Sequence, residues 1–444
     1  MFSLKLKRTL MPGGTSLPHF KGTSGIAPVR MPAPESVIIP MSMHIGAPAQ
    51  LAVKLGDHVD VGQLIASAPS FVSAPIYASI SGTVKKIDTV LSSAGSTIQA
   101  VHIQSDGLMT PYAELKAPEV TDYASFISAV RESGAVGLGG AGFPTAVKLD
   151  VKDTSRISEI VINGAECEPY ITSDTRTMLD RVDDIKYGVE LLEKYLDAKK
   201  IIFGIESNKP ECIAEMKKLA DEDPKIEVVS LPSRYPQGGE KVLVYNTTGK
   251  LIPEGKLPID VGSIVLNCTT LAFIASYIKT GMPLVEKCVT VAGGAVKDPQ
   301  NVIVPIGTRL RDVFDFCGGF ICEPKKVLWG GPMMGISVPD LDETILKNTN
   351  AILALTEKES PTVKTTSCIR CGSCINACPL HLDPTAFTRA YKNKDGAQLE
   401  ALHLGMCMEC GCCSFVCPAK QPLVQRNRLA KTVMKQYQAS KPKN

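Results

Sequence analysis

The chain changes its pattern of apolar and polar positions several times, and each change marks a different kind of element. Between residues 37 and 104, short alternating runs with turn glycines at Gly56 and Gly62 predict strands joined by tight turns. From Thr121 to about Pro283, helical spacing alternates with short apolar runs, which is typical of an α/β domain. We therefore expect a multidomain protein with β and α/β parts.

Several elements of the α/β part can be predicted individually. The segment "DYASFISAVRESGAVG" has helical periodicity, and Asp122 is suited to cap its first turn. The apolar runs "EIVIN" and "KIIFGI" predict strands. The residues of "RTMLDRVDDIKYGVELLEKYL", 176–196, follow the period of one amphipathic helix.

The remaining segments complete a division into domains. The segment "VKLGDHVDVGQLI" resembles the biotinyl and lipoyl barrel-sandwich family, but the tip "APSFVSAP" has no lysine to carry a cofactor, so we interpret this domain as a scaffold. A strand, turn, strand and helix pattern between Glu286 and Gly335 predicts a small β-grasp unit. The predicted parts are an N-terminal extension (1–36), a barrel-sandwich hybrid (37–110), an α/β domain (120–283), a β-grasp domain (284–345), a cysteine-rich domain (358–425) and a basic tail (426–444).

Cysteine spacing carries the strongest chemical signal. The strings "CIRCGSCINACP" and "CMECGCCSFVCP" both fit C-x2-C-x2-C-x3-C-P, in which the fourth cysteine ligates the other of two 4Fe-4S clusters. This predicts one cluster on Cys368, Cys371, Cys374 and Cys417, and a second on Cys407, Cys410, Cys413 and Cys378, with Cys412 spare. Structural zinc is the alternative, although zinc sites usually pair two C-x2-C motifs across a long spacer.

Composition excludes some functions. A net charge of +3 gives no general support for nucleic-acid binding. No apolar run approaches the roughly 18 residues that a membrane span needs. The cysteines outside the two motifs show no paired framework, so we expect a reducing cytoplasm. The basic residues after Lys420 predict either a solvated tail or a segment that docks on an anionic membrane or an acidic partner.

A glycine-rich loop follows the first predicted helix of the α/β domain. In "VGLGGAGFPTAVKL", Gly137, Gly139 and Gly142 satisfy G-x-G-x-x-G. A dinucleotide fold needs a strand directly before that loop, whereas here a helix is predicted, which argues against it. Glycines nevertheless let a phosphate or a ring approach the backbone closely, so the loop stays a candidate ligand site.

Longer strings carry a resemblance to known families. The string "GGAGFPTAVKL" followed by "INGAECEP" resembles the flavin-binding region of the NADH-oxidising subunit of respiratory complex I. Together with "IPMSMHIGAPA", "YPQGGEK", "GGPMMG" and the double cysteine motif, nearly the whole chain resembles the RnfC family of the Rnf electron-transport complex. The resemblance implies an FMN and NADH domain, a soluble-ligand-binding β-grasp domain and a two-cluster ferredoxin domain.

The resemblance also implies roles for individual residues. Glu166 and Glu168 would hold the catalytic positions, Glu166 facing the flavin, and Glu168 would contact the nicotinamide nucleotide with Phe143. The flavin-binding positions would be Gly137, Gly139, Gly140, Lys148, Asn163, Tyr235, Gly238, Glu240, Asn267 and Thr270. Read without the resemblance, Phe143 could equally belong to a core and Lys148 to an exposed helix face. The chain has Leu138 where the pattern has an arginine.

The resemblance implies a peripheral subunit on the cytoplasmic side of the membrane, exchanging electrons between NADH and ferredoxin. Its partners would be the other Rnf subunits, integral membrane ones included, with ferredoxin reached through them and ions pumped by the whole complex. A flavin can join a two-electron hydride donor to one-electron clusters. Two alternatives stay open: a cobalamin-reductase type of enzyme, and an adaptor without nucleotide binding. Ala165 and Leu257 favour the adaptor, because the pattern has an acidic and an aromatic residue there.

Overall fold

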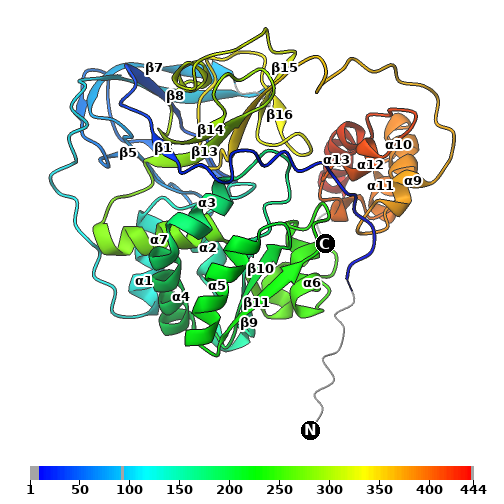
Figure 1. The fold of residues 1–444 in the computed structure, drawn as a ribbon, viewed down its shortest axis with the longest axis horizontal. Coiled ribbons are helices and arrows are strands. Elements are labelled where there is room, and N and C mark those ends of the chain that lie inside the picture. The colour runs from blue at the N-terminus through cyan, green and yellow to red at the C-terminus, as the bar shows by residue number, and fades with distance from the viewer. Residues whose placement is uncertain (1–9, 92–94, 442–444) are drawn as a thin grey trace.

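The computed structural model describes residues 10–91 and 95–441, which form three domains built on sheets and a helical domain joined to them by a long linker (Figure 1). The helical domain, orange and red in Figure 1, follows residue 360 and lies beside the others. We call it the cluster domain, because it contains both cysteine motifs.

The barrel-sandwich hybrid consists of two sheets with strand orders β2-β8-β7-β4 and β3-β5-β6. Its core lies between them and includes Val37, Ile65 and Val101. Leu138 and Ile306, from the two neighbouring domains, insert into this same core. The strands are β2 (Ser36–Pro40), β3 (Gln50–Leu51), β4 (His58–Val59), β5 (Leu64–Ser67), β6 (Ile76–Tyr77), β7 (Gly82–Leu91) and β8 (Thr97–Ser105).

The α/β domain is a parallel sheet with the order β11-β10-β9-β12. Side chains alternate across it: Ile160 and Ile162 face the large core with α1–α5 and α7, while Val161 faces a smaller core with α6. The elements are α1 (Tyr123–Glu132), α2 (Thr145–Leu149), β9 (Glu159–Gly164), α3 (Ser173–Asp180), α4 (Val182–Leu196), β10 (Ile201–Glu206), α5 (Pro210–Glu222), β11 (Ile226–Leu231), α6 (Glu240–Thr248), β12 (Ser263–Asn267) and α7 (Cys268–Thr280), with 3-10 turns at Thr154–Arg156 and Pro258–Val261.

Two sequence expectations can be compared with these helices. Asp122 caps α1 as expected, because its carboxylate accepts from the amide of Ser125 at 2.8 Å. The single helix expected over 176–196 is wrong, since the structure has α3 and α4 with a break at Arg181. The Arg181 backbone (φ −125°, ψ 36°) is not helical, and the carboxylates of Asp183 and Asp184 suit the positive end of a new helix.

The β-grasp domain has one sheet with the order β1-β14-β13-β17-β15-β16. Strand β1 comes from the N-terminal extension and pairs in parallel with β14, while β17 lies beyond residue 345. The sheet therefore gathers strands from three stretches of the chain. Its elements are β1 (Val29–Arg30), β13 (Glu286–Ala292), β14 (Gln300–Pro305), α8 (Leu310–Phe316), β15 (Lys326–Trp329), β16 (Ile336–Ser337) and β17 (Ala351–Leu355).

The cluster domain contains the C-terminal basic segment as an integral helix. Ala430 and Met434 of α13 pack with Phe387 and Leu404 in its core. Lys431 pairs with Glu409 at 2.7 Å, so part of the basic charge is neutralised. The segment is therefore not a solvated tail over its described length. The helices are α9 (Ser373–Asn376), α10 (Pro384–Lys392), α11 (Gly396–Ala401), α12 (Cys412–Phe415) and α13 (Leu423–Ser440), with a 3-10 turn at Leu404–Met406.

Residues 10–30, which we call the N-terminal strap, cross three domains as an extended segment (dark blue in Figure 1). Gly14 donates to the carbonyl of Ala377 in the cluster domain at 2.9 Å. Thr15 pairs with Tyr235 of the α/β domain. Farther along, β1 joins the β-grasp sheet.

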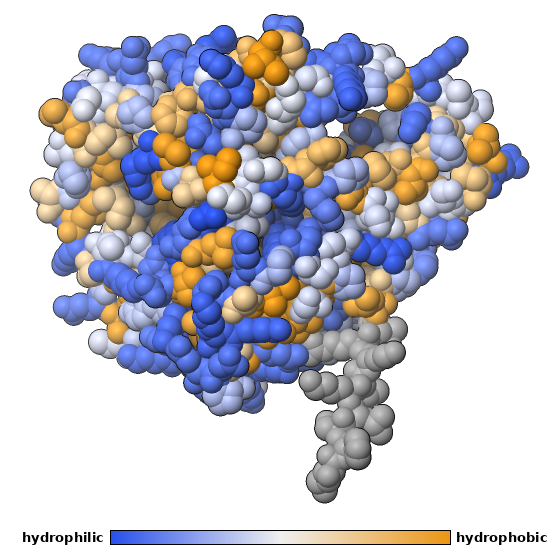
Figure 2. All heavy atoms as spheres, viewed as in Figure 1, coloured by the Kyte–Doolittle hydropathy of each residue, from blue (hydrophilic) through white to orange (hydrophobic). Residues whose placement is uncertain are grey.

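The surface of the described part mixes polar and apolar residues, and hydrophobic spheres gather on the cluster domain at the right of Figure 2. Over residues 10–91 and 95–441, every helix is too short or too polar to cross a membrane.

Candidate functional site

The glycine loop, residues 137–143, leaves α1 and closes on itself. The Gly137 amide donates to the Phe143 carbonyl at 2.8 Å, and the Leu138 amide donates to the Thr270 hydroxyl at 2.9 Å. The Leu138 side chain is buried in the barrel core, which explains why an apolar residue stands at this position. The barrel also supports the loop from outside, since Ile45 donates to the carbonyl of Gly142 at 3.0 Å.

Two asparagines lie at the carboxyl ends of neighbouring parallel strands, and Asn267 lies against Gly139 of the glycine loop. Asn163 of β9 and Asn267 of β12 are register partners. Asn267 caps α7 by accepting from the amides of Thr269 and Thr270, and its side-chain amide donates to Asp174 at 2.7 Å. The carboxyl edge of a parallel sheet is where such folds bind ligands. The sequence-predicted positions Asn163, Asn267 and Thr270 are thus brought together.

Lys148 and the Tyr235–Glu240 loop form the next wall of this region. The Lys148 ammonium donates to Glu240 at 3.2 Å and to the carbonyl of Val265 at 3.0 Å. The Asn163 side chain donates to the carbonyl of Gly238 at 3.0 Å. A cation, amides and exposed glycine backbone therefore surround one end of the sheet, which is the donor chemistry that a phosphorylated ring needs.

The two exposed glycines of the loop differ in a way that tests the fit of a ligand. A Cβ on Gly139 would lie 2.2 Å from the side-chain nitrogen of Asn267, so this glycine is required by the fold itself. A Cβ on Gly140 would meet no protein atom within 4 Å. The protein thus leaves open space next to Gly140, and the placing of a flavin there stays a prediction.

The carboxylate of Glu166 is engaged by the first turn of α3. Its carboxylate accepts from the amide of Asp174 at 2.6 Å and from the hydroxyl of Thr175 at 2.5 Å, at the start of α3. Burial raises the pKa of this carboxyl group. In this structure Glu166 caps a helix, and its role toward a flavin stays a prediction.

Glu168 reaches the β-grasp domain. Its carboxylate accepts from the backbone amides of Met333 and Met334 at 3.1 and 2.7 Å. Burial raises the pKa of Glu168 to about 7, partly opposed by those two hydrogen bonds. Phe143 is half-buried within the glycine loop. The predicted contacts of Glu168 and Phe143 with a nucleotide also stay predictions.

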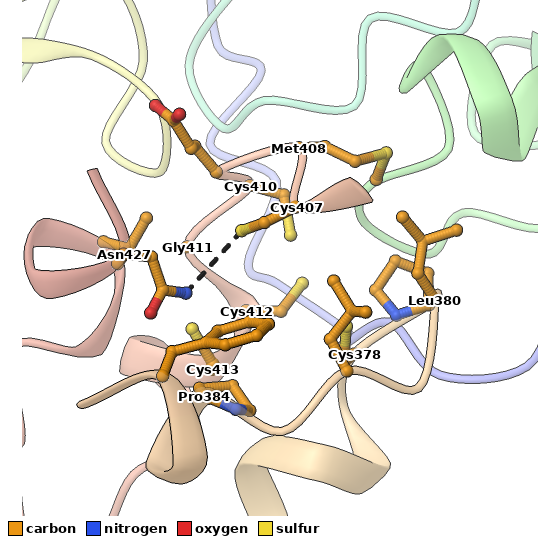
Figure 3. A pocket seen from close by; sticks show the side chains of 15 residues that line it. Cys378, Leu380, Pro384, Cys407, Met408, Cys410, Gly411, Cys412, Cys413 and Asn427 are labelled. Carbon is orange, nitrogen blue, oxygen red and sulfur yellow. Dashed lines mark hydrogen bonds between the residues drawn. The ribbon is translucent and has the colours of Figure 1, made fainter. Parts of the chain in front are cut away.

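Five cysteines from both motifs line one pocket of the cluster domain: Cys378 from the first motif and Cys407, Cys410, Cys412 and Cys413 from the second. Figure 3 shows them around a common space. Without the spare Cys412, four remain: Cys378, Cys407, Cys410 and Cys413. The side chain of Asn427 donates to the sulfur of Cys407 at 3.6 Å. This is the crossed set that the spacing predicts for one 4Fe-4S cluster.

The other predicted cluster ligands, Cys368, Cys371, Cys374 and Cys417, include two exposed cysteines. Cys374 and Cys417, one from each motif, pack together with Leu423 and Val424. The amide of Gln421 donates to the sulfur of Cys417 at 3.5 Å. Cys368 and Cys371 are exposed, as is the apolar side chain of Ile369 between them.

The extra cysteine, Cys412, is fully buried in the lining of the same pocket as Cys407. A hydrogen bond with Cys410 raises the pKa of the Cys412 thiol and lowers that of Cys410. The Cys412 sulfur also lies 3.8 Å from the carbonyl of Tyr235. The Tyr235 hydroxyl donates to the carbonyl of Cys410 at 2.6 Å. Tyr235, predicted to face a flavin, thus contacts the cluster loop directly.

Three segments pack closely against the cluster domain, and a glycine lies at each contact. A Cβ on Gly239 would lie 3.1 Å from Met408, which lines the Cys407 pocket. A Cβ on Gly13 of the strap would lie 2.5 Å from the carbonyl oxygen of Cys378. Met333 approaches Gly411 from the β-grasp domain in the same way. Three segments therefore hold the Cys407 pocket against the glycine-loop region.

Comparison with protein families covers most of the chain. The models that match are the RnfC barrel sandwich hybrid domain (residues 9–108), the Nuo51 FMN-binding domain (130–276), the SLBB domain (288–337) and the 4Fe-4S dicluster domain (364–432). The predicted fold class is thereby confirmed. The dicluster match favours iron–sulfur clusters over structural zinc. A solved NAD+-reducing [NiFe]-hydrogenase chain matches with a TM-score of 0.48 and 18% identity over 73% of this chain and 64% of that one.

Fold and site together define a flavin- and iron–sulfur-dependent electron-transfer protein. The chain is 44% identical, over 80% of its length and 78% of the relative's, to the C subunit of the proton-translocating ferredoxin:NAD(+) oxidoreductase complex of Clostridium ljungdahlii. It is 40% identical, over 86% and 87%, to the C subunit of the Na(+)-translocating complex of Acetobacterium woodii. The chain belongs to this family, the RnfC subunits of ion-translocating oxidoreductase complexes.

Proposed function

We propose that this chain transfers electrons between NADH and ferredoxin as the RnfC subunit of a membrane-bound, ion-translocating complex. The observation that carries the proposal is the direct contact of the Tyr235–Glu240 loop, beside the glycine loop, with the Cys407 pocket. When bound, FMN can accept a hydride from NADH and pass its two electrons on one at a time. The residues of this chain would bind the FMN, position the groups around it and exclude water from the site.

The geometry supports an order for the two cluster sites. The site of Cys378, Cys407, Cys410 and Cys413 lies against the α/β domain, the strap and the β-grasp domain. The other site has exposed ligands, Cys368 and Cys371, on the outer side of the cluster domain. We propose that the first exchanges electrons with the flavin site and the second with the next protein of the complex.

The proposed setting is the cytoplasmic side of the membrane, where the chain would bind integral membrane subunits and reach ferredoxin through them. The names of its relatives as parts of a complex support this setting. The matched barrel domain argues against a cobalamin-reductase type of enzyme. An adaptor without nucleotide binding is the second candidate, favoured by the engagement of Glu168 with Met333 and Met334 instead of open solvent.

Two glycine variants test the flavin site. Gly140→Val should abolish FMN binding and NADH oxidation, because its side chain would fill the open space of the proposed site without touching the protein. Gly25→Val, on an exposed glycine of the strap that also has no neighbour within 4 Å, is the matched control and should keep both. Full FMN content in Gly140→Val would show that the flavin binds elsewhere.

A cysteine variant separates the two redox parts. Cys371→Ser should retain NADH oxidation with ferricyanide as acceptor, because the flavin site lies in another domain, while ferredoxin-linked activity of the assembled complex should be lost. Stopped-flow absorbance after mixing with NADH follows flavin and clusters separately. If the wild-type flavin stays oxidised in excess NADH, the adaptor becomes the better conclusion.

A further inference from the structure

The N-terminal strap runs along the loop that carries Glu166 and Glu168. The amide of Tyr170 donates to the carbonyl of His19 at 3.0 Å, and the Phe20 and Tyr170 rings stack with centroids 4.8 Å apart. The hydroxyls of Thr23 and Thr172 lie 2.6 Å apart in a buried network. Residues 165–172, which we call the glutamate loop, are therefore covered by the strap along most of their length.

Lys21 of the strap makes the most hydrogen bonds to the glutamate loop. Its ammonium donates to the backbone carbonyls of Glu166 at 2.8 Å, Glu168 at 2.8 Å and Ile171 at 2.5 Å. An ammonium has three donors, so all of them are directed to this one loop. Hydrogen bonds from a charged donor are stronger than neutral ones, and more so away from water.

The glutamate loop needs such support. Glu166 (φ 45°) and Tyr170 (φ 70°) both have left-handed backbone, which is unfavourable for residues with a side chain. With its carbonyls drawn to Lys21, the loop directs its side chains to different neighbours: Glu166 to α3, Cys167 to the amide of Gly238 at 3.3 Å, and Glu168 to Met333 and Met334. Lys209, also near, donates to the carbonyls of Ala165 at 2.6 Å and Glu166 at 3.5 Å, so it supports the first two residues of the loop, whereas Lys21 reaches as far as Ile171.

We propose that Lys21 is a positioning residue for the nucleotide side of the flavin site, holding the glutamate loop so that Glu168 is correctly placed for NADH. This rests on the function proposed above. The strap belongs to the segment matched by the barrel domain model and lies outside the FMN-binding model. A segment outside the flavin domain thus completes its nucleotide site.

The test compares full-length, FMN- and cluster-loaded variants in NADH oxidation with ferricyanide. Lys21→Met removes the three hydrogen bonds and should raise KM for NADH about tenfold, with kcat and FMN content changed less than about twofold. Lys21→Arg, which keeps a charged donor, should restore part of the loss. Thr23→Val is the matched control in the same strap, because it removes a loop contact without touching the carbonyls, and its KM should be that of the wild type.

Each result decides the inference. A wild-type KM in Lys21→Met would overturn it, and so would an equal rise in Thr23→Val, which would mean that any loosening of the strap has the same effect. If Lys21→Met does not fold, Lys21→Gln decides, because its amide is uncharged and has fewer donors: a raised KM supports the inference and a wild-type KM overturns it. A wild-type protein whose flavin NADH does not reduce would overturn the proposed function together with this inference, whereas a failure in the variants alone leaves that function standing.

Discussion

Lys347 is a buried lysine whose removal should change how stability depends on pH. Its ammonium donates to the carbonyls of Pro75 in the barrel at 2.5 Å and of Gly134 after α1 at 2.8 Å, and the side chain has no exposed surface. Burial lowers the pKa of Lys347 from 10.5 to about 7. The lysine therefore joins three domains, and its charged form carries a desolvation cost.

The size of this pH effect follows from the difference in proton binding between the folded and the unfolded state. Between pH 7 and 10.5 the folded state binds fewer protons at this group than the unfolded state, so the free energy of unfolding rises with pH across that window. The full change corresponds to about 5 kcal/mol, and to about 3 kcal/mol between pH 7 and 9.5. Lys347→Met removes the titration and leaves two carbonyls unpaired, a cost that does not depend on pH.

Urea unfolding of wild type and Lys347→Met at several pH values, followed by fluorescence of the single tryptophan, Trp329 of β15, measures this difference. The advantage of the wild type over the variant should grow by about 3 kcal/mol from pH 7 to 9.5. A constant difference across that range would refute the assigned pKa and the reasoning built on it.

Three further predictions concern the cluster domain and Glu168. Cys417→Ser should damage the cluster held by Cys368, Cys371 and Cys374, and Cys378→Ser the other, in a protein that otherwise holds about eight iron atoms per chain; zinc without iron, and no EPR signal on reduction, would contradict this. Deleting residues 426–444 should unfold the cluster domain, because Ala430 and Met434 belong to its core, and proteolysis would reveal it; a protease-resistant deletion variant would argue against that role. Because the pKa of Glu168 is raised to about 7, the folded state binds more protons than the unfolded state between pH 4.5 and 7, and the free energy of unfolding should fall by about 3 kcal/mol as pH rises through that range. Urea titrations of Glu168→Gln should lose this slope. Parallel pH profiles for the variant and the wild type would count against the prediction.

Local signals in the sequence predicted much of the fold. The cap at Asp122, the apolar runs of β9 and β10 and the cysteine spacing each depend on residues close together in the chain, and each has a distinctive pattern. The break at Arg181 was missed because the apolar period continues through it while the backbone does not.

The candidate site was predictable only in part. Residues on the carboxyl ends of β9 and β12 could be placed by family pattern, and the structure brings them together. The partners of Lys21 are backbone carbonyls some 145 residues away, which leave no trace in side-chain identity. The partner of Glu168 is likewise a pair of backbone amides, 165 and 166 residues distant.

The N-terminal strap has a consequence for how the chain is made. Synthesis releases residues 10–30 before their partners, which include Tyr235, Ile303 and Ala377, so the strap cannot dock fully until most of the chain has left the ribosome. Contacts of such long sequence separation form late, after the domains they join. We therefore expect this segment, which leaves the ribosome before its partners, to be seated only after the domains that it joins have folded.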